Sequence, residues 1–377
     1  MKYLSKENLI RRGGKTALVR IDLNIEGGSK NYFRIDAVLP TVELLLKNGI
    51  KVVILSHRGR PSKQTQKDSL RPFQKIITKR LKEDVLFIKN PLEKGIREFV
   101  KKSSKRVFLV ENLRFWPGEE TNSPIFAKKL AIFGDFYVND GFPVSHRTNA
   151  SISAITRFLP SYTGLQFEKE IKNLDNAIKN FKPPLIFVLG GIKTIDKLSV
   201  LNFFKNRADK FLLGGGPSTT FFAAQGLPIG DSLYDKNMDM KPYLKNKKII
   251  LPIDTMIENK KILDIGPKTA KIYSDIIKKS KTIIWSGPMG VFENKKFAGG
   301  TKSIWEAIFY ASRNNNAKAI VGGEETVASL QLLTHNKKQE TGNGNLFLST
   351  GGGAMLEYLA GEKMPGIEAL EKNQKNL

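Results

Sequence analysis

Short apolar runs alternate along this chain with segments whose apolar residues recur every three or four positions. The runs are typical of buried strands, and the spaced segments are typical of helices. The strands expected in the first half are Thr16–Ile21, Lys51–Leu55, Val107–Val110 and Asp135–Val138. The helices expected between them are Ala37–Lys47, Phe73–Lys82 and Phe126–Ile132.

The same alternation restarts after Pro160. The strands expected there are Leu185–Leu189, Lys210–Leu213, Lys248–Leu251, Thr282–Trp285, Ala319–Val321 and Leu346–Ser349. Strands that alternate with helices predict an α/β fold in which each sheet is mainly parallel and has helices on both faces. Ligands of such folds bind at the carboxyl ends of the strands, so the loops that follow the strands are the candidates for function.

The length of the chain predicts two domains, because 377 residues are too many for one ordinary core. A polar helix with spaced apolar residues is expected over Glu168–Phe181, and Pro183-Pro184 would end it. We therefore expect an N-terminal domain at 1–165, a connecting helix at 166–182 and a C-terminal domain at 183–360.

Composition excludes several kinds of site. The chain has no cysteine, which excludes disulfides, thiolate zinc sites and a cysteine nucleophile, and its three histidines argue against a histidine-rich metal centre. The apolar runs are too short to cross a bilayer, and residues 1–9 lack the apolar core of a secretory signal. We therefore expect an intracellular protein without a membrane partner.

The formal charge of +26 favours a polyanionic partner at first sight. However, 47 of the 62 basic residues are lysines spread over the whole chain, which resembles compositional bias more than a nucleic-acid surface. We expect no specific nucleic-acid partner, although a basic nucleic-acid-binding protein stays open as an alternative. Attraction of anionic metabolites is a simpler consequence of the same charge.

Arginine and glycine are distributed unequally along the chain. Thirteen of the 15 arginines lie in the first 160 residues, and 22 of the 32 glycines lie after them. Arginine grips carboxylate or phosphate with a planar fork of donors, whereas glycine lets backbone N–H groups approach a phosphate closely. The first half therefore suits a small anion and the second half a nucleotide, as a two-substrate phosphoryl-transfer enzyme would require.

The loops after the first-half strands carry acids, amides and arginines. They contain Arg20–Asn24, Ser56–Pro61, Glu111–Phe115 and Asn139–Asn149, and with Arg34 they make five loops that could converge on one anion. Each arginine taken alone is more readily a surface charge than a ligand. The repetition at one kind of topological position is what favours a binding site.

Glycine-rich loops follow the second-half strands. Gly190–Lys197 places two lysines four residues apart, which would put both on one face of a helix, and it lacks the glycine spacing of a Walker A loop. Gly214–Gly216 and Gly351–Gly353 lie between a strand and a helix and suit phosphate or adenine, unless they are only tight turns. Ser286–Glu293 ends in an acid that could hold ribose hydroxyls.

In order and spacing, these strings resemble those of the phosphoglycerate kinase family almost from end to end. The matching strings are Arg20–Asn24, Ser56–Pro61, Glu111–Phe115, Pro117–Glu120, Gly190–Lys197, Leu263–Thr269, Gly287–Glu293 and Ser349–Ala354. The resemblance implies two similar-sized α/β domains that face each other across a cleft, with residues 361–377 returning to the N-terminal domain. It implies a cytoplasmic, monomeric enzyme of glycolysis that uses Mg²⁺. The enzyme would transfer a phosphoryl group reversibly between ATP and 3-phosphoglycerate, giving ADP and 1,3-bisphosphoglycerate.

The resemblance also implies roles for individual residues. The substrate-binding residues would be Asp22, Leu23, Asn24, Arg34, His57, Arg58, Gly59, Arg60, Arg114 and Arg147. The nucleotide-binding residues would be Lys197, Gly215, Gly216, Gly290, Glu293, Gly322, Gly323, Glu324 and Glu325, with Glu325 also a metal ligand. The catalytic residues would be Arg34, Lys193, Lys197 and Gly352. Because the acceptor carboxylate is already ionised at neutral pH, no general base is required, and catalysis would rest on alignment and positive charge.

One departure from the family's pattern bears on function. The family usually carries Gly-Gly-Gly-Asp where this chain has Gly322-Gly323-Glu324-Glu325. Glu324 would put a side chain and a negative charge near the transferring phosphoryl group, unless it points away and Glu325 alone serves the metal. A weakly active or non-catalytic phosphoglycerate-binding relative therefore stays open beside the active kinase.

Overall fold

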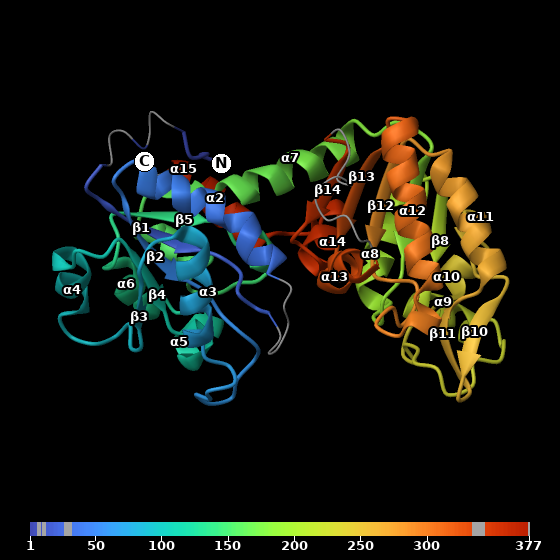
Figure 1. Cartoon of the computed structure of the whole chain (residues 1–377), viewed down its shortest axis with the longest axis horizontal. Coiled ribbons are helices and arrows are strands. Elements are labelled where there is room, and N and C mark those ends of the chain that lie inside the picture. The colour runs from blue at the N-terminus through green and yellow to red at the C-terminus, as the bar shows by residue number, and fades with distance from the viewer. Residues whose placement is uncertain (6–8, 10–12, 26–31, 334–343, 376–377) are drawn as a thin grey trace. The chain divides into compact units, whose positions relative to one another are not determined.

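The computed structural model describes residues 1–5, 9, 13–25, 32–333 and 344–375. The chain divides into an N-terminal unit (Met1–Ile171 with Lys363–Leu377) and a C-terminal unit (Lys172–Glu362). Each unit contains a six-stranded sheet in which all neighbouring strands are parallel, with helices packed against it (Figure 1). The α/β architecture expected from the sequence is thereby confirmed.

The sheet of the N-terminal unit has the strand order β3-β4-β2-β1-β5-β6. Its strands are β1 (Thr16–Arg20), β2 (Lys51–Leu55), β3 (Val85–Ile88), β4 (Val107–Val110), β5 (Phe136–Asn139) and β6 (Ser161–Thr163). Its α-helices are α2 (Phe33–Lys47), α3 (Arg71–Leu81), α4 (Ile96–Lys102), α5 (Pro117–Glu120), α6 (Pro124–Ala131) and α15 (Pro365–Lys375). Its short 3₁₀ helices are η1 (Leu113–Phe115), η2 (Phe142–Val144) and η3 (Ala154–Arg157).

The four central strands of this sheet are almost completely buried because both faces are covered. Val19 and Ile54 point to the face covered by α2 and α3, whose buried residues form one cluster with them. Phe108 points to the other face, where its ring meets that of Phe99 from α4 edge to face at 6.3 Å between centroids. This two-sided packing fixes the register of the strands, so their carboxyl ends lie at one edge.

The sheet of the C-terminal unit has the strand order β14-β13-β12-β7-β8-β9. Its strands are β7 (Leu185–Leu189), β8 (Lys210–Leu213), β9 (Ile249–Ile250), β12 (Thr282–Ser286), β13 (Lys318–Gly322) and β14 (Leu346–Ser349). Its helices are α8 (Ile195–Phe204), α9 (Gly215–Ala224), α10 (Lys241–Leu244), α11 (Pro267–Lys278), α12 (Gly299–Asn314), α13 (Glu324–Leu333) and α14 (Gly353–Leu359), with the 3₁₀ helix η4 (Lys295–Phe297). A separate antiparallel pair joins β10 (Thr255–Glu258) to β11 (Lys261–Ile265), which the apolar pattern did not predict.

Alternate residues of β7 show how this second sheet is covered. Val188 belongs to the cluster that α11 and α12 form with the sheet, and these two helices lie side by side in Figure 1. Phe187 points to the other face, where its ring lies 4.8 Å from that of Phe204 in α8. Both faces of the sheet are therefore buried, as the continuous apolar runs predict.

The long helix α7 (Leu165–Lys179) begins in the N-terminal unit and continues into the C-terminal unit. At its start, the buried carboxyl of Asp140 accepts hydrogen bonds from the Phe167 N–H (2.8 Å) and the Thr41 hydroxyl (2.6 Å). Burial raises the pKa of Asp140 to about 7. At the other end, the guanidinium of Arg207 donates to the carbonyl of Ile178. Each end of α7 is thus fastened to the unit in which it lies.

The C-terminal helix α15 packs within the N-terminal unit. The amide of Gly366 donates to the carbonyl of Ser145 (2.8 Å), and the side-chain oxygen of Asn373 accepts from the amide of Ser161 at the start of β6 (2.9 Å). The described part of this segment therefore completes the unit that begins at Met1, and residues 376–377 lie outside the described residues.

Candidate functional site

The predicted substrate-binding residues of the N-terminal unit lie at the carboxyl edge of its sheet. Asp22 and Asn24 follow β1, His57 follows β2, and Arg114 lies in η1 after β4. These strands are neighbours in the order β4-β2-β1-β5, so their loops meet at one edge. Arg34 is an exception to the predicted loop positions, because α2 begins at Phe33 and Arg34 lies in its first turn.

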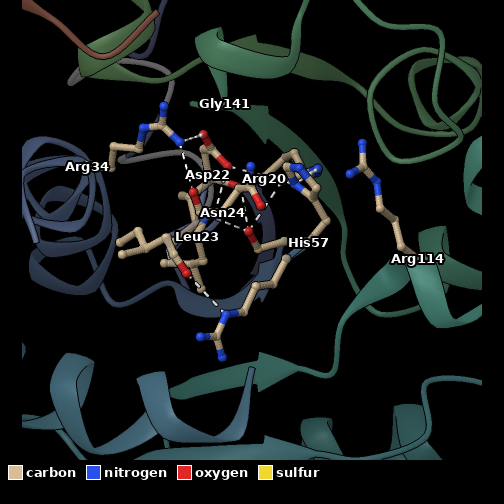
Figure 2. Close-up of polar contacts among 12 residues, drawn as sticks. Arg20, Asp22, Leu23, Asn24, Arg34, His57, Arg114 and Gly141 are labelled. Carbon is tan, nitrogen blue, oxygen red and sulfur yellow. Dashed lines mark hydrogen bonds and ion pairs between the residues drawn. The ribbon is translucent and has the colours of Figure 1, made fainter. Parts of the chain in front are cut away.

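Arg34 is held by the loop after β1. Its guanidinium lies 3.0 Å from the Asp22 carboxylate and donates to the backbone carbonyl of Asn24, also at 3.0 Å (Figure 2). The two side chains of the ion pair are 14% and 4% exposed, so the pair is only weakly screened by solvent. Asp22 thus orients the Arg34 guanidinium, and part of the Arg34 side chain stays accessible to a ligand.

Asn24 and Gly59 join the loops after β1 and β2. The side-chain oxygen of Asn24 accepts a hydrogen bond from the Gly59 N–H at 2.8 Å, and Arg114 donates to the carbonyl of Gly59. Gly59 has a φ of +62°, a left-handed conformation that favours glycine. This turn therefore links the loop that holds Arg34 to the segments that carry His57 and Arg114.

His57 is buried among cations. Its Nδ1 atom lies 3.1 Å from a terminal nitrogen of Arg20 and 3.8 Å from the Asp22 carboxylate (Figure 2). Burial holds the pKa of His57 well below its usual value, and the charges of Arg20, Arg114, Arg147 and Arg34 lower it further. His57 is therefore a neutral imidazole at neutral pH and acts as a hydrogen-bonding group instead of an acid or base.

Arg114 and Arg147 supply further positive charge. Burial lowers the pKa of Arg114 to about 10, with Arg147 adding to the shift and Glu120, 3.4 Å away, opposing it. A guanidinium with this pKa is still charged at neutral pH. Arg147 is half-buried and its Nε donates to His146 at 3.1 Å. These cations are close enough to repel one another, which favours the binding of an anion between them.

The remaining predicted residues of this unit differ in what they can contact. The Arg58 side chain donates to the carbonyls of Ile25 and Ser69 and lies over the ring of Phe73, so it stabilises its own loop. Leu23 is fully buried, and its backbone N–H donates to the Ser56 hydroxyl at 2.9 Å. Arg60 is exposed. We call the set Asp22, Asn24, Arg34, His57, Arg114 and Arg147, which the structure gathers, the arginine site.

Three buried polar residues next to the arginine site were not predicted to have a function. Arg20, Glu119 and Ser151 are at most 1% exposed and are hydrogen-bonded to one another. The sequence did contain a signal, because Arg20 is the one charged residue in the otherwise apolar run Ala17–Ile21. A charged residue inside a buried strand requires a dedicated partner.

In the C-terminal unit, the glycine-rich loops pack on one another at the carboxyl edge of the sheet. A Cβ atom on Gly215 would lie 2.5 Å from the carbonyl oxygen of Gly191, and one on Gly216 would lie 2.0 Å from that of Ile192. A Cβ on Gly287 would likewise lie 2.2 Å from the backbone of Gly190. These glycines are therefore required by close contact between loops, a reason that the sequence pattern alone did not reveal.

The same loops enclose a cavity of about 550 Å³, which we call the glycine-lined cavity. Five predicted nucleotide-binding residues line it, namely Gly215, Gly216, Gly290, Glu293 and Glu325. The apolar side chains of Ile192, Leu233, Val291 and Phe292 also line it. An apolar cavity of this size beside helix starts suits a planar base with phosphates attached. The lining does not include Lys193, Lys197, Gly322, Gly323, Glu324 or Gly352.

The two predicted lysines do not share a helix face, which corrects the expectation from their spacing. Helix α8 begins at Ile195, so Lys193 lies before it and is exposed, whereas Lys197 lies in its first turn and is buried. Gly191, with a φ of +75°, turns the chain before the helix, and the Thr194 N–H donates to the Asp235 carboxylate at 2.7 Å. Lys193 therefore lies in the loop between β7 and α8.

The charge of Lys197 is linked to that of Glu325. Burial lowers the pKa of Lys197, while the negative charges of Asp196 and Glu325 oppose this shift. Glu324 and Glu325 form the first turn of α13, where the positive end of the helix dipole favours acids. Glu325 lines the glycine-lined cavity and Glu324 does not. Before this helix, Gly323 has a φ of +101°, and a Cβ on Gly352 would lie 3.8 Å from its Cα.

Asp264, which was not predicted, lies at the wall of the glycine-lined cavity. Its carboxyl accepts hydrogen bonds from the Gly300 N–H (2.7 Å) and the Ile265 N–H (2.9 Å), and burial raises its pKa to about 7. A Cβ on Gly290 would lie 2.5 Å from its Oδ1 atom. Asp264 therefore connects β11 to the start of α12 directly behind the loop that lines the cavity.

A metal ion would have few protein ligands in this unit. Within the described residues, no group of three or more His, Cys, Asp or Glu side chains is arranged to hold a metal ion. Mg²⁺ often uses only one or two carboxylates and takes its other ligands from phosphates and water. Glu325, at the cavity wall and near Lys197, fits this kind of site.

Among the described helices, none is both long and apolar enough to span a lipid bilayer.

Comparisons with known proteins agree over nearly the whole chain. The family model described as phosphoglycerate kinase matches residues 8–362. Phosphoglycerate kinases of Chloroflexus aggregans and Clostridium kluyveri are 37% and 38% identical to this chain, with 95% of this chain and 96% of each relative covered.

Solved structures agree with the same assignment. The phosphoglycerate kinase of Pyrococcus horikoshii superimposes with a TM-score of 0.84 at 31% identity, covering 100% of both chains. That of Coxiella burnetii gives a TM-score of 0.75 at 30% identity, covering 98% of this chain and 99% of the other. These matches extend through both units, and the chain belongs to the phosphoglycerate kinase family.

Proposed function

We propose that this protein is an active phosphoglycerate kinase, which transfers a phosphoryl group reversibly between ATP and the carboxylate of 3-phosphoglycerate. The observation that carries the proposal is the coexistence of two sites of opposite character. The arginine site gathers cations around a polar loop, and the glycine-lined cavity combines apolar walls with exposed backbone. A transferase that joins a small polyanion to a nucleotide requires both.

The arginine site is proposed to bind the three-carbon acid. Such a ligand carries a carboxylate and a phosphate, and both groups are recognised well by guanidinium forks. Arg34 and Arg114 are the best placed, because each is anchored by the loops around Gly59 and keeps donors available. Neutral His57 adds a donor without adding charge. Asp22 and Asn24 orient Arg34 and the loops around it, and Arg58, Gly59, Arg60 and Arg147 are proposed to complete the site.

The glycine-lined cavity is proposed to bind the nucleotide. The base would lie between its apolar walls, and Glu293 would accept from the ribose hydroxyls. The phosphates would lie near the backbone of Gly215 and Gly216 at the start of α9, within reach of Lys197. On the basis of the family's motifs, Gly322 and Gly323 are proposed to contact the nucleotide. Lys193 and Gly352 are proposed to lie near the transferred group.

Glu325 is proposed to hold the Mg²⁺ that accompanies the nucleotide. The bound cation would neutralise part of the phosphate charge and thereby make the phosphorus easier to attack. The role of this chain's carboxylate is to orient the metal and, through its charge, to keep the Lys197 amine protonated. Glu324 would remain outside this contact, because it does not line the cavity.

The chemistry requires alignment more than proton transfer. The attacking carboxylate needs no general base at neutral pH. The low pKa of His57 agrees with this, since a neutral imidazole can donate a hydrogen bond but does not change charge during the reaction. The protein's contribution is to hold the two ligands in line and to surround the transferred group with positive charge. Monomeric state and cytoplasmic location are proposed on the family resemblance alone.

A coupled assay tests the proposal directly. Purified protein with ATP, Mg²⁺ and 3-phosphoglycerate should form ADP and 1,3-bisphosphoglycerate, and omission of any one component should abolish the reaction. Calorimetric titration with each ligand should be run on the same sample. Binding of 3-phosphoglycerate and ATP without turnover would instead identify the non-catalytic relative that Glu324 and Glu325 suggest.

A further inference from the structure

A line of buried hydrogen bonds runs behind the arginine site. The Glu119 carboxylate accepts from the backbone N–H of Ser151 (3.0 Å) and from its hydroxyl (2.6 Å). The hydroxyl oxygen of Ser151 accepts from Nε of Arg20 at 2.9 Å. A terminal nitrogen of Arg20 lies 3.1 Å from Nδ1 of His57 (Figure 2). All four residues are at most 2% exposed.

The direction of every hydrogen bond in this line is fixed by the groups that form it. A guanidinium can only donate, so Arg20 must donate both to Ser151 and to Nδ1 of His57. The single proton of the Ser151 hydroxyl is then directed to the Glu119 carboxylate, which accepts it. Because Nδ1 uses its lone pair to accept from Arg20, the single proton of a neutral imidazole must lie on Nε2.

We propose that Glu119, Ser151 and Arg20 are positioning residues that hold His57 in the tautomer with its proton on Nε2. The remaining hydrogen-bonding atom of the ring is then always a donor. The Asp22 carboxylate does not compete for the proton, because its oxygen is 3.8 Å from Nδ1, beyond hydrogen-bonding distance. The charges of Arg114, Arg147 and Arg34 also act on His57, and all three disfavour a second proton on the ring.

The tautomer matters for an anionic ligand. A ring with its proton on Nδ1 would turn a lone pair toward the acid and repel it, whereas Nε2–H donates to it. The inference therefore deepens the proposed function and rests on it for the statement that the ligand is the phosphoglycerate. Glu119 and Ser151 do not touch that ligand but act through Arg20 and His57.

Nitrogen NMR of histidine-labelled protein tests the tautomer without any substrate. The chain has only three histidines, His57, His146 and His335, and the spectrum of a His57→Gln variant identifies the His57 signals. We expect a protonated Nε2 and an unprotonated Nδ1 in the native protein at neutral pH. A proton on Nδ1, or a doubly protonated ring, overturns the proposal. This measurement decides the matter even if the Ser151 variants fail to fold.

Variants of Ser151 test the line of hydrogen bonds from Glu119 to His57. In Ser151→Ala we expect the two ring-nitrogen signals of His57 to move toward each other as both tautomers become populated. We expect KM for 3-phosphoglycerate to rise about fivefold, the effect of one ordinary hydrogen bond, while KM for ATP changes less than twofold. Ser151→Thr keeps the hydroxyl and should restore both readouts.

Ser153→Ala is the matched control. Its hydroxyl is buried two residues away and has no hydrogen-bond partner among the described residues. It should leave the His57 signals and both KM values unchanged. If Ser151→Ala behaves like Ser153→Ala in both readouts, the proposal is wrong. Absence of turnover in the native protein, with the expected NMR signals, would refute the proposed function but leave the tautomer assignment intact.

Discussion

The two candidate sites of this protein are built from different parts of the chain. In the arginine site the functional groups are side chains, and ion pairs such as that between Arg34 and Asp22 orient them. In the glycine-lined cavity the walls are largely backbone and apolar side chains, and Gly215, Gly216 and Gly290 allow the loops to pack closely. One site is therefore defined by charge and the other by shape.

This difference predicts which substitutions each site tolerates. Removing a cation from the arginine site leaves the backbone in place, so the fold should survive while activity falls. Adding a single methyl group to a glycine of the cavity leaves the charge unchanged but forces two loops apart, so both stability and nucleotide binding should fall.

Arg34→Ala should cause the largest loss of activity. If Arg34 stabilises the transferred group, its removal should lower kcat about 10²–10³-fold, as removal of a pre-organised donor does elsewhere. The unfolding free energy should change by about 1 kcal/mol, because Asp22 keeps the backbone N–H of Asn24 as a hydrogen-bond partner (3.0 Å) when the ion pair is lost. Steady-state kinetics and urea denaturation of the same preparation measure the two quantities.

Arg80→Ala is the control for Arg34→Ala. Arg80 also forms an ion pair with an aspartate, Asp36, in the same unit, but it lies outside the arginine site and is partly exposed. Its removal should leave kcat within twofold of the native value, as expected for a surface ion pair. Equal losses of activity and stability in Arg34→Ala would show that Arg34 is structural, and the contrast between the sites would not hold.

Gly216→Ala should destabilise the cavity. The added Cβ would lie 2.0 Å from the carbonyl oxygen of Ile192, a contact that only movement of the backbone can relieve. We expect a loss of about 1–3 kcal/mol in unfolding free energy, and a rise in KM for ATP larger than that for 3-phosphoglycerate. Gly299→Ala is the matched control, since it also lies at a helix start and has nothing within 4 Å of its Cβ position. Similar stabilities of the two variants would contradict the prediction.

The fold could be predicted from the sequence because buried parallel strands are continuous apolar runs. Lys51–Leu55, Val107–Val110, Leu185–Leu189, Lys210–Leu213 and Leu346–Ser349 were predicted with the bounds that the structure shows. The strands that the pattern missed lie at sheet edges or outside the main sheets. The edge strand β3 has two half-exposed residues, and the β10–β11 pair is mostly half-exposed. Partly solvated strands carry a weaker apolar signal.

The sites were predictable in their residues but not in their geometry. Strand order places Asp22, His57 and Arg114 at one edge, and the loops that carry them could be read from the sequence. The partners behind them come from distant positions, such as Glu119 and Ser151 behind Arg20, and no local pattern indicates such pairs. Lys193 was assigned to a helix because spacing alone does not show where a helix begins.

Asp264→Asn should change how stability depends on pH. Because the pKa of Asp264 is raised to about 7 by burial, the folded protein keeps a proton that the unfolded chain releases above about pH 4. This carboxyl therefore makes the native protein less stable as pH rises from about 4 to 7, and asparagine does not. Relative to the native protein, the variant's unfolding free energy should rise by about 2 kcal/mol between pH 5 and pH 7.

Denaturant titrations at several pH values measure this difference, and the pH-independent cost of the substitution cancels in the comparison. A difference that is flat or falls with pH would show that Asp264 is ionised in the folded protein. The backbone N–H groups of Gly300 and Ile265 would then outweigh burial, and charge would contribute to the cavity that we describe as defined by shape.

Glu325→Gln and Glu324→Gln should separate the two acids that depart from the family's pattern. The negative charge of Glu325 opposes the burial that lowers the pKa of Lys197, so its removal should let that pKa fall further. The alkaline limb of the pH–rate profile, measured at saturating Mg²⁺, should then move to lower pH by about half a unit in Glu325→Gln. Glu324 does not line the glycine-lined cavity, and Glu324→Gln should shift the limb less than Glu325→Gln does. A rise in turnover in both variants would mean instead that the two acids hinder transfer, and that this chain is a weakened kinase whose cavity is limited by charge after all.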